Sequence, residues 1–288
     1  MIKQQFNKQE ICNAFNQAAN HYQDAAILQL EIAKRLDERL DFVHLSPEKV
    51  VDLGSGTGVL TRHMKSRFTK AQVIGLDLAE KMLKQARAQD KLFKKNNWLA
   101  ADIEQLPFVS ESLDLVTSSS CLHWVSDLPK VFSEVWRVLK PGSLFTFTSF
   151  GPDTLKELKA SFSAVDHYPH VNEFIDMHDI GDMLLKQGFS DPVMDMEYIQ
   201  MTYSDVMGLM KDLKTIGANN HAQHKRRGLM SRSALELMKK SYEQYRNSEG
   251  VLPATFEVIY GHAWVPEQKQ QLNSGEVLVS LESLRKKK

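Results

Sequence analysis

The chain has 288 residues, of which 42% are hydrophobic, and its 36 basic residues balance its 36 acidic residues, so the formal net charge is zero. A chain of this size can bury one sizeable α/β core plus an added helical element, and we expect a single domain over residues 1–288. Zero net charge argues against bulk attraction to nucleic acid or to an anionic membrane.

Two further features bear on location and chemistry. The chain contains no apolar run of roughly eighteen residues, the length that crosses a membrane, and the polar stretch from Met1 to Glu10 lacks the apolar core of a secretion signal. We therefore expect a cytoplasmic protein without membrane contact. The two cysteines, Cys12 and Cys121, match no metal-site spacing, which predicts structural thiols and no bound metal.

An apolar stripe at helical spacing predicts a helix over residues 13–40, ahead of the first strand. The stripe consists of Phe15, Ala19, Tyr22, Ala26, Leu30, Ala33 and Leu36. We expect its later part to pack on a sheet, and residues 1–45 to form an N-terminal helical cover.

The most informative segment is Val50-Val51-Asp52-Leu53-Gly54-Ser55-Gly56-Thr57-Gly58. Its apolar start predicts a strand over 49–53. The glycines that follow carry no Cβ and can adopt positive φ, so a ligand can lie against the backbone. Apolar positions after Thr57 indicate a helix whose first amides and dipole face that ligand. A second strand, predicted over 72–76, ends at Asp77, which is placed to bind both hydroxyls of a ribose.

The spacing of these glycines indicates which nucleotide is bound. Dinucleotide-binding loops read Gly-x-Gly-x-x-Gly, whereas Gly54, Gly56 and Gly58 read Gly-x-Gly-x-Gly. Asp52 would oppose a pyrophosphate but suits a ligand that carries an ammonium and a sulfonium. The pattern favours S-adenosylmethionine over NAD, the alternative being an ordinary strand-to-helix turn without a ligand.

Five tracts in order resemble the motifs of class I S-adenosylmethionine-dependent methyltransferases. They are Asp52–Gly58, Gly75–Asp77, Ala101–Phe108, Leu113–Ser118 and Arg137–Gly142; the sequence departs only at Ser143, where a second glycine is common. The resemblance implies a Rossmann-like α/β sheet of seven strands with the last strand antiparallel, and a cofactor-binding core over 46–200. It also implies a set of cofactor contacts, with Asp102 and the next backbone amide at the adenine: Asp52, Gly54, Ser55, Gly56, Gly58, Asp77, Leu78, Met82, Asp102 and Ile103.

The remaining elements follow from hydrophobic patterns. Strands are expected near 96–100, 113–118, 143–149, 193–200 and 253–265, and a helix over 176–187 that Gly188 ends. Residues 204–248 interrupt this pattern as a helical lid, with helices over 205–216 and 233–246. The lid has nine basic residues and four acidic ones. We expect either a solvated helical face or a docking surface for an acidic partner, formed by Lys225, Arg226, Arg227 and Arg232.

Three tracts outside the core resemble one branch, the malonyl-[acyl-carrier protein] O-methyltransferases of biotin synthesis. They are Ser149–Leu155, Met210–Asn219 and Tyr260–Trp264, so the resemblance covers nearly the whole chain. It implies methyl transfer from S-adenosylmethionine, which becomes S-adenosylhomocysteine, to the free carboxylate of a malonyl group carried by acyl-carrier protein or by coenzyme A. The ester lets fatty-acid synthesis elongate the group towards pimeloyl, and the acidity of acyl-carrier proteins gives the basic lid a purpose.

This chemistry needs no general base, because a carboxyl with a pKa near 4 is already ionised at neutral pH. The enzyme gains most from alignment and from exclusion of water. We expect substrate contacts from Tyr22, on the leading helix, and from His123 and Trp124 after the fourth strand; a structural hydrogen bond is the alternative for His123. Methylation of a small free acid or other metabolite, or a scaffold that binds the cofactor without turnover, are the alternative functions.

Overall fold

The computed structural model describes residues 6–90, 96–218 and 230–268. Within them, seven strands form one sheet in the order β3-β2-β1-β4-β5-β7-β6. Their bounds are β1 Lys49–Leu53, β2 Gln72–Asp77, β3 Asn97–Ala100, β4 Leu113–Ser118, β5 Leu139–Phe150, β6 Ser190–Tyr203 and β7 Leu252–Trp264. Strands β1 to β5 pair in parallel, whereas β7 is antiparallel to both β5 and β6. The predicted seven-stranded Rossmann-like sheet with an antiparallel last strand is confirmed.

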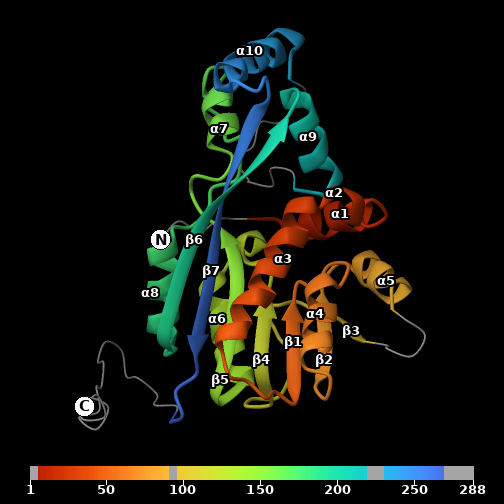
Figure 1. Ribbon diagram of the computed structural model, residues 1–288, viewed down its shortest axis with the longest axis vertical. Helices are drawn as coiled ribbons and strands as arrows, with labels where there is room; N and C mark the ends of the chain where they lie inside the picture. The colour runs from red at the N-terminus through yellow and green to blue at the C-terminus, as the bar shows by residue number, and fades with distance from the viewer. Residues whose placement is uncertain (1–5, 91–95, 219–229, 269–288) are drawn as a thin grey trace.

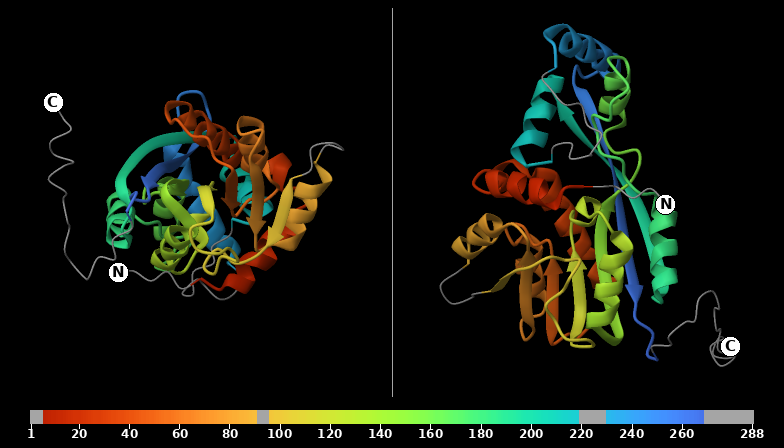
Figure 2. Two further views of the ribbon diagram at one scale, coloured as in Figure 1. Left: turned by 90° about the horizontal axis from the view of Figure 1, so that it is seen from below. Right: turned by 180° about the vertical axis from the view of Figure 1, so that it is seen from behind.

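Helices cover both faces of this sheet (Figures 1 and 2). They are α1 Lys8–Ala18, α2 Tyr22–Ala25, α3 Ile27–Arg39, α4 Val59–Arg67, α5 Glu80–Ala88, α6 Leu128–Val138, α7 Lys156–Ser163, α8 Met177–Gln187, α9 Val206–Thr215 and α10 Arg232–Tyr242, with short 3-10 turns η1 Leu40–Phe42, η2 Leu122–Trp124 and η3 Glu243–Tyr245. Helices α3 and α4 contribute to the core on one face, and α6 and α8 to the core on the other. In the described residues, none of the helices has the length and apolarity that crossing a membrane requires.

Burial on both faces explains why the central strands are apolar along their whole length. Val50, Val51, Leu115 and Val116 are fully buried in β1 and β4. Parallel sheets covered by helices on both sides have such continuous apolar strands. The buried faces of these two strands are therefore closed to a ligand, and their loops are what a ligand can reach.

The single helix predicted over residues 13–40 is wrong, because the chain turns twice within that range. Helix α1 starts early, where the side chain of Asn7 accepts hydrogen bonds from the amides of Gln9 and Glu10, and it ends at Ala18. Ala26 leaves helical geometry, with φ −84° and ψ 40°, between α2 and α3. The apolar spacing runs on across these turns, but α1 crosses the carboxyl-terminal edge of the sheet while α3 packs along its face (Figure 1).

Strands β6 and β7 extend well beyond the rest of the sheet and carry the helical lid. They have 14 and 13 residues, against five in β1. Their far ends support α7, α9 and α10 above the carboxyl-terminal edge (Figure 1). There the buried Tyr242 of α10 donates a hydrogen bond to the carbonyl of Pro253 at 2.9 Å. Antiparallel pairing up to Tyr203 and Leu252 explains why β6 is longer than the predicted 193–200.

Candidate active site

The glycine loop joins β1 to α4 and is tied to the end of β2. Gly54 and Gly56 have φ of +66° and +53°, a region that favours glycine. The amide of Gly56 donates to Asp77 Oδ2 at 2.8 Å, and the amide of Ala79 donates to Asp77 Oδ1 at 2.7 Å. Burial raises the pKa of the Asp77 carboxyl, and these amide bonds counteract the shift. One carboxylate therefore sets the loop against the start of α5.

A pocket opens in front of this loop, and we call it the glycine-loop pocket. Its wall contains seven of the ten residues predicted to contact the cofactor: Gly54, Gly56, Asp77, Leu78, Met82, Asp102 and Ile103. A Cβ built on Gly56 would have no atom within 4 Å, so the loop backbone faces open space there. The structure thus brings together residues that are almost fifty positions apart in the sequence.

The other three predicted contacts, Asp52, Ser55 and Gly58, are not among the residues that line the pocket. Asp52 is 1% exposed and accepts hydrogen bonds from the hydroxyls of Thr61, at 2.6 Å, and Thr117, at 3.3 Å. Burial raises its pKa to about 7 despite these bonds. A Cβ on Gly58 would lie 2.2 Å from the Trp98 ring, which gives this glycine a packing role.

Helix α1 covers the glycine-loop pocket through polar contacts that the sequence analysis missed. Lys8 Nζ lies 2.7 Å from both Asp102 Oδ2 and Glu104 Oε2. Burial raises the pKa of the Asp102 carboxyl, but the hydrogen bond from Lys8 leads the effects that lower it overall. The Cys12 thiol donates to the carbonyl of Leu78 at 3.5 Å. No local motif marks Lys8, because its partners lie more than ninety residues away.

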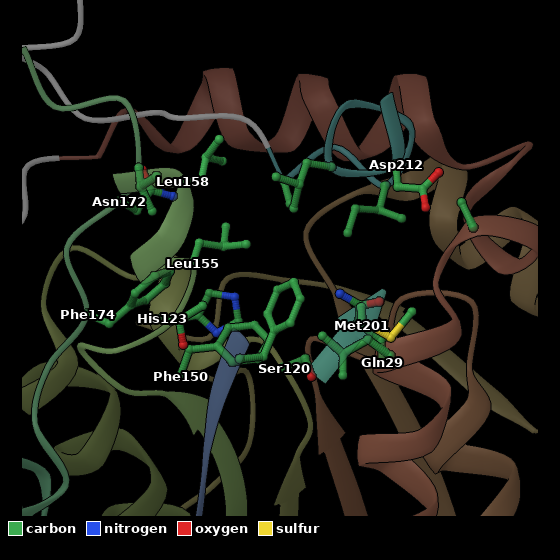
Figure 3. Close-up of a pocket in the computed structure, with 18 of the residues that line it drawn as sticks. Gln29, Ser120, His123, Phe150, Leu155, Leu158, Asn172, Phe174, Met201 and Asp212 are labelled. Atoms are coloured by element: carbon green, nitrogen blue, oxygen red, sulfur yellow. The ribbon is translucent and has the colours of Figure 1, made fainter. Parts of the chain in front are cut away.

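A second pocket, which we call the apolar pocket, adjoins the first. The two share a wall of four residues, the junction: Phe15, Tyr22, Ser120 and Trp124. Beyond the junction the apolar pocket runs between the start of α3, α7 and α9, and much of its lining is apolar, including Leu155, Leu158, Phe174, Met201, Leu213 and Phe256 (Figure 3). Among the described residues that line it there is no lysine or arginine.

The three predicted substrate contacts meet at these two pockets. Tyr22 and Trp124 belong to the junction, with Phe15 packed edge-on against both rings at 6.3 and 5.5 Å between centroids. His123 lines the apolar pocket, 4.6 Å from the Phe150 ring. Burial lowers the pKa of His123 to about 3, so its imidazole is neutral, and burial raises the pKa of Tyr22, so its hydroxyl stays protonated.

The predicted basic docking surface is described only in part. Arg232 is exposed at the first position of α10, whereas Lys225, Arg226 and Arg227 lie outside the described residues. Within the described ranges, no group of three or more His, Cys, Asp or Glu side chains is arranged to hold a metal ion.

Comparisons with known proteins agree with this geometry. Residues 51–147 match a family model described as a methyltransferase domain. The chain is 46% identical over 275 residues to the malonyl-[acyl-carrier protein] O-methyltransferase of Methylovorus sp. (strain MP688), a match that covers 93% of each chain. The chain belongs to the malonyl-[acyl-carrier protein] O-methyltransferase family.

A second relative and a solved structure agree with this family and with its fold. It is 44% identical over 278 residues to the malonyl-[acyl-carrier protein] O-methyltransferase of Gallionella capsiferriformans (strain ES-2), covering 94% of this chain and 96% of the relative. The crystal structure of the YcgJ protein from Bacillus subtilis aligns with a TM-score of 0.58 at 16% identity, covering 83% of this chain and 99% of the other. That likeness is one of fold.

The close contact between Gly54 and Cys121 leads to a first prediction. In Gly54→Ala the new Cβ would lie 2.1 Å from Cys121 Sγ. We expect overpacking to lower the free energy of unfolding by about 1–3 kcal/mol, and strain of the left-handed backbone to lower it by about 1–2 kcal/mol more. In a Cys121→Gly background only the strain should remain, so urea unfolding of the four proteins should give a coupling of about 1–3 kcal/mol. If the double variant instead loses the sum of the two single losses in unfolding free energy, the contact between these residues is contradicted.

The buried carboxyl of Asp52 leads to a second prediction. Its pKa is about 7 in the folded chain against 3.8 for the free group, so the folded state retains a proton that the unfolded state has lost between these pH values. Relative to Asp52→Asn, the unfolding free energy of the wild type should therefore fall by up to about 4 kcal/mol from pH 4 to pH 7. Chemical denaturation at each pH measures this difference, and parallel curves for the two proteins would refute it.

Proposed function

We propose that this protein transfers a methyl group from S-adenosylmethionine to the free carboxylate of a malonyl group on acyl-carrier protein, giving the methyl ester and S-adenosylhomocysteine. The observation that supports this most is the junction, the wall that the glycine-loop pocket and the apolar pocket share. The similarity to malonyl-[acyl-carrier protein] O-methyltransferases supports the choice of acceptor. A donor and an acceptor bound on its two sides would meet there.

The glycine-loop pocket fits S-adenosylmethionine. The Asp77 carboxylate stands at the end of β2, where it can accept from the ribose hydroxyls, and the open backbone at Gly56 leaves room for the ligand. Asp102 and the amide of Ile103 would hold the adenine from the next loop. When bound, the donor supplies an electrophilic methyl group on a sulfonium. Tyr22 and Trp124 would then separate that sulfonium from water.

The acceptor needs no proton removed, because its carboxyl is ionised at neutral pH. Tyr22 in the junction stays protonated, and His123 beside it is a weak base because burial lowers its pKa to about 3, so neither side chain is suited to remove a proton. The protein contributes alignment of the carboxylate with the methyl group and a site closed by Phe15, Tyr22 and Trp124. Transfer is then a single in-line displacement.

Incubation of the purified protein with methyl-labelled S-adenosylmethionine tests this function. We expect label in a base-labile ester when malonyl-acyl-carrier protein is present, and less with malonyl-coenzyme A or free malonate. Label with free malonate alone would indicate a small-acid methyltransferase. Cofactor binding without transfer to any of the three would indicate a scaffold, and either result would contradict the proposal.

We further propose that the acidic carrier protein docks on the basic lid at Lys225, Arg226, Arg227 and Arg232. Complementary charge mainly steers association and weakens with salt. The exposed position of Arg232 on α10, which packs against α7 and is hydrogen-bonded to β7 through Tyr242, supports this placement.

Charge reversal tests the docking surface. The triple variant Arg226→Glu, Arg227→Glu and Arg232→Glu should raise KM for malonyl-acyl-carrier protein about tenfold or more at low salt, with kcat and KM for malonyl-pantetheine unchanged. A matched control reverses three exposed lysines outside the lid, Lys34, Lys70 and Lys186. Equal effects of the two triple variants would show that only net charge matters and would exclude this docking site.

A further inference from the structure

Ser120 has an unusual backbone at the point where the two pockets meet. It follows β4 by two residues and has φ of +52°, in the left-handed region that L side chains rarely adopt. Its amide donates a 2.8 Å hydrogen bond to the hydroxyl of Thr148, which is 1% exposed on β5. Backbone strain of this kind persists where neighbours hold it, and it concentrates at functional sites.

Among the described residues that line the apolar pocket, two have a buried side-chain polar atom without a hydrogen-bond partner: Ser120, with Oγ, and His123, with Nδ1. Buried polar atoms are normally paired, so each such atom requires an explanation. Both residues line the apolar pocket, and Figure 3 shows them in its lower part, away from Asn172 and Asp212. A ligand that accepts hydrogen bonds at this position would satisfy both atoms.

The charges around these atoms indicate which ligand that is. No lysine or arginine lines the described part of the apolar pocket, and its one acidic lining residue there, Asp212, lies at the opposite end of the view in Figure 3. In carboxyl methylation the negative charge of the acceptor is lost as the bond forms. A fixed cation would stabilise the reactant more than the transition state, and so would slow transfer. Neutral hydrogen-bond donors position a carboxylate with less stabilisation of the charged reactant than a cation would give. Hydrogen bonds to an ionised acceptor are stronger than those between two neutral groups.

We propose that Ser120 and His123 hold the acceptor carboxylate, the serine hydroxyl donating to one oxygen and the imidazole N–H to the other. This assignment rests on the proposed function. A lone pair of one oxygen then faces the glycine-loop pocket. The new bond joins that oxygen to the methyl carbon, the methyl–sulfur bond breaks with its electron pair going to sulfur, and no proton moves. Thr148 is a positioning residue, because it fixes the backbone that aims the Ser120 hydroxyl.

Variants at both positions can remove the donors with little change of shape. Ser120→Gly suits the left-handed backbone and deletes only the hydroxymethyl group. His123→Phe keeps a ring beside Phe150, Phe174 and Trp124 but has no N–H. Acetyl-pantetheine, which lacks the carboxylate of malonyl-pantetheine, serves as the matched ligand.

The test is calorimetric titration of the full chain, saturated with S-adenosylhomocysteine, with each pantetheine thioester. We expect the wild type to bind the malonyl form at least tenfold more tightly than the acetyl form. Each variant should lose most of that ratio, with its Kd for the acetyl form and for S-adenosylhomocysteine within twofold of wild type. The second Kd also shows that the variant is folded.

Kinetics separate this inference from the proposed function. In the variants, KM for malonyl-acyl-carrier protein should rise about tenfold and kcat less, with the pH profile unchanged from pH 6 to pH 9. A malonyl preference in a wild type that transfers no methyl group would refute the proposed function and leave the carboxylate site standing. Methyl transfer by a wild type without that preference, or variants that keep the preference, would overturn the assignment of Ser120 and His123.

Discussion

The carboxylate of Asp77 is the constraint on which the site depends. Its two oxygens accept amide hydrogen bonds from Gly56, in the loop after β1, and from Ala79, at the start of α5. The parallel pairing of β1 with β2 brings these segments to one edge of the sheet. A single side chain thus holds the glycine loop and the start of α5 together. Among the described residues, no other side chain covers the loop backbone at Gly56, which faces the pocket. The same group thereby fixes the loop, and in the proposed function it also binds the ribose.

The acceptor side depends on a different feature, the length of β6 and β7. A sheet that ended level with β4 would leave the junction open to solvent. The extended pair instead carries α9 and α10 above it, and α9 contributes Leu213 to the wall of the apolar pocket. The contact of Tyr242 with Pro253 fastens α10 to β7. The glycine-loop pocket and the apolar pocket thus arise from separate parts of the fold and share the junction.

The described titratable side chains at and beside the junction, Tyr22 and His123, are uncharged in the place where the proposed transfer removes charge. Tyr22 stays protonated and His123 neutral, because burial disfavours their charged forms. The charge of Lys8, which also lines the glycine-loop pocket, is paired with Asp102 and Glu104. A reaction between a cation and an anion that yields neutral products benefits from such a setting, since fixed charges would favour the reactants.

Sequence by itself determined what depends on local order: the strand before the glycine loop and the helix after it, the end of β2 at Asp77, the helix that Gly188 ends, and the family. It did not show that the apolar stripe through Tyr22 and Ala26 is broken into three helices, because short turns preserve the spacing. Only the tertiary structure revealed Lys8 against Asp102 and the hydroxyl of Ser120 at the junction. These features depend on contacts between distant segments and on one backbone angle held by Thr148, and neither leaves a pattern in the neighbouring residues.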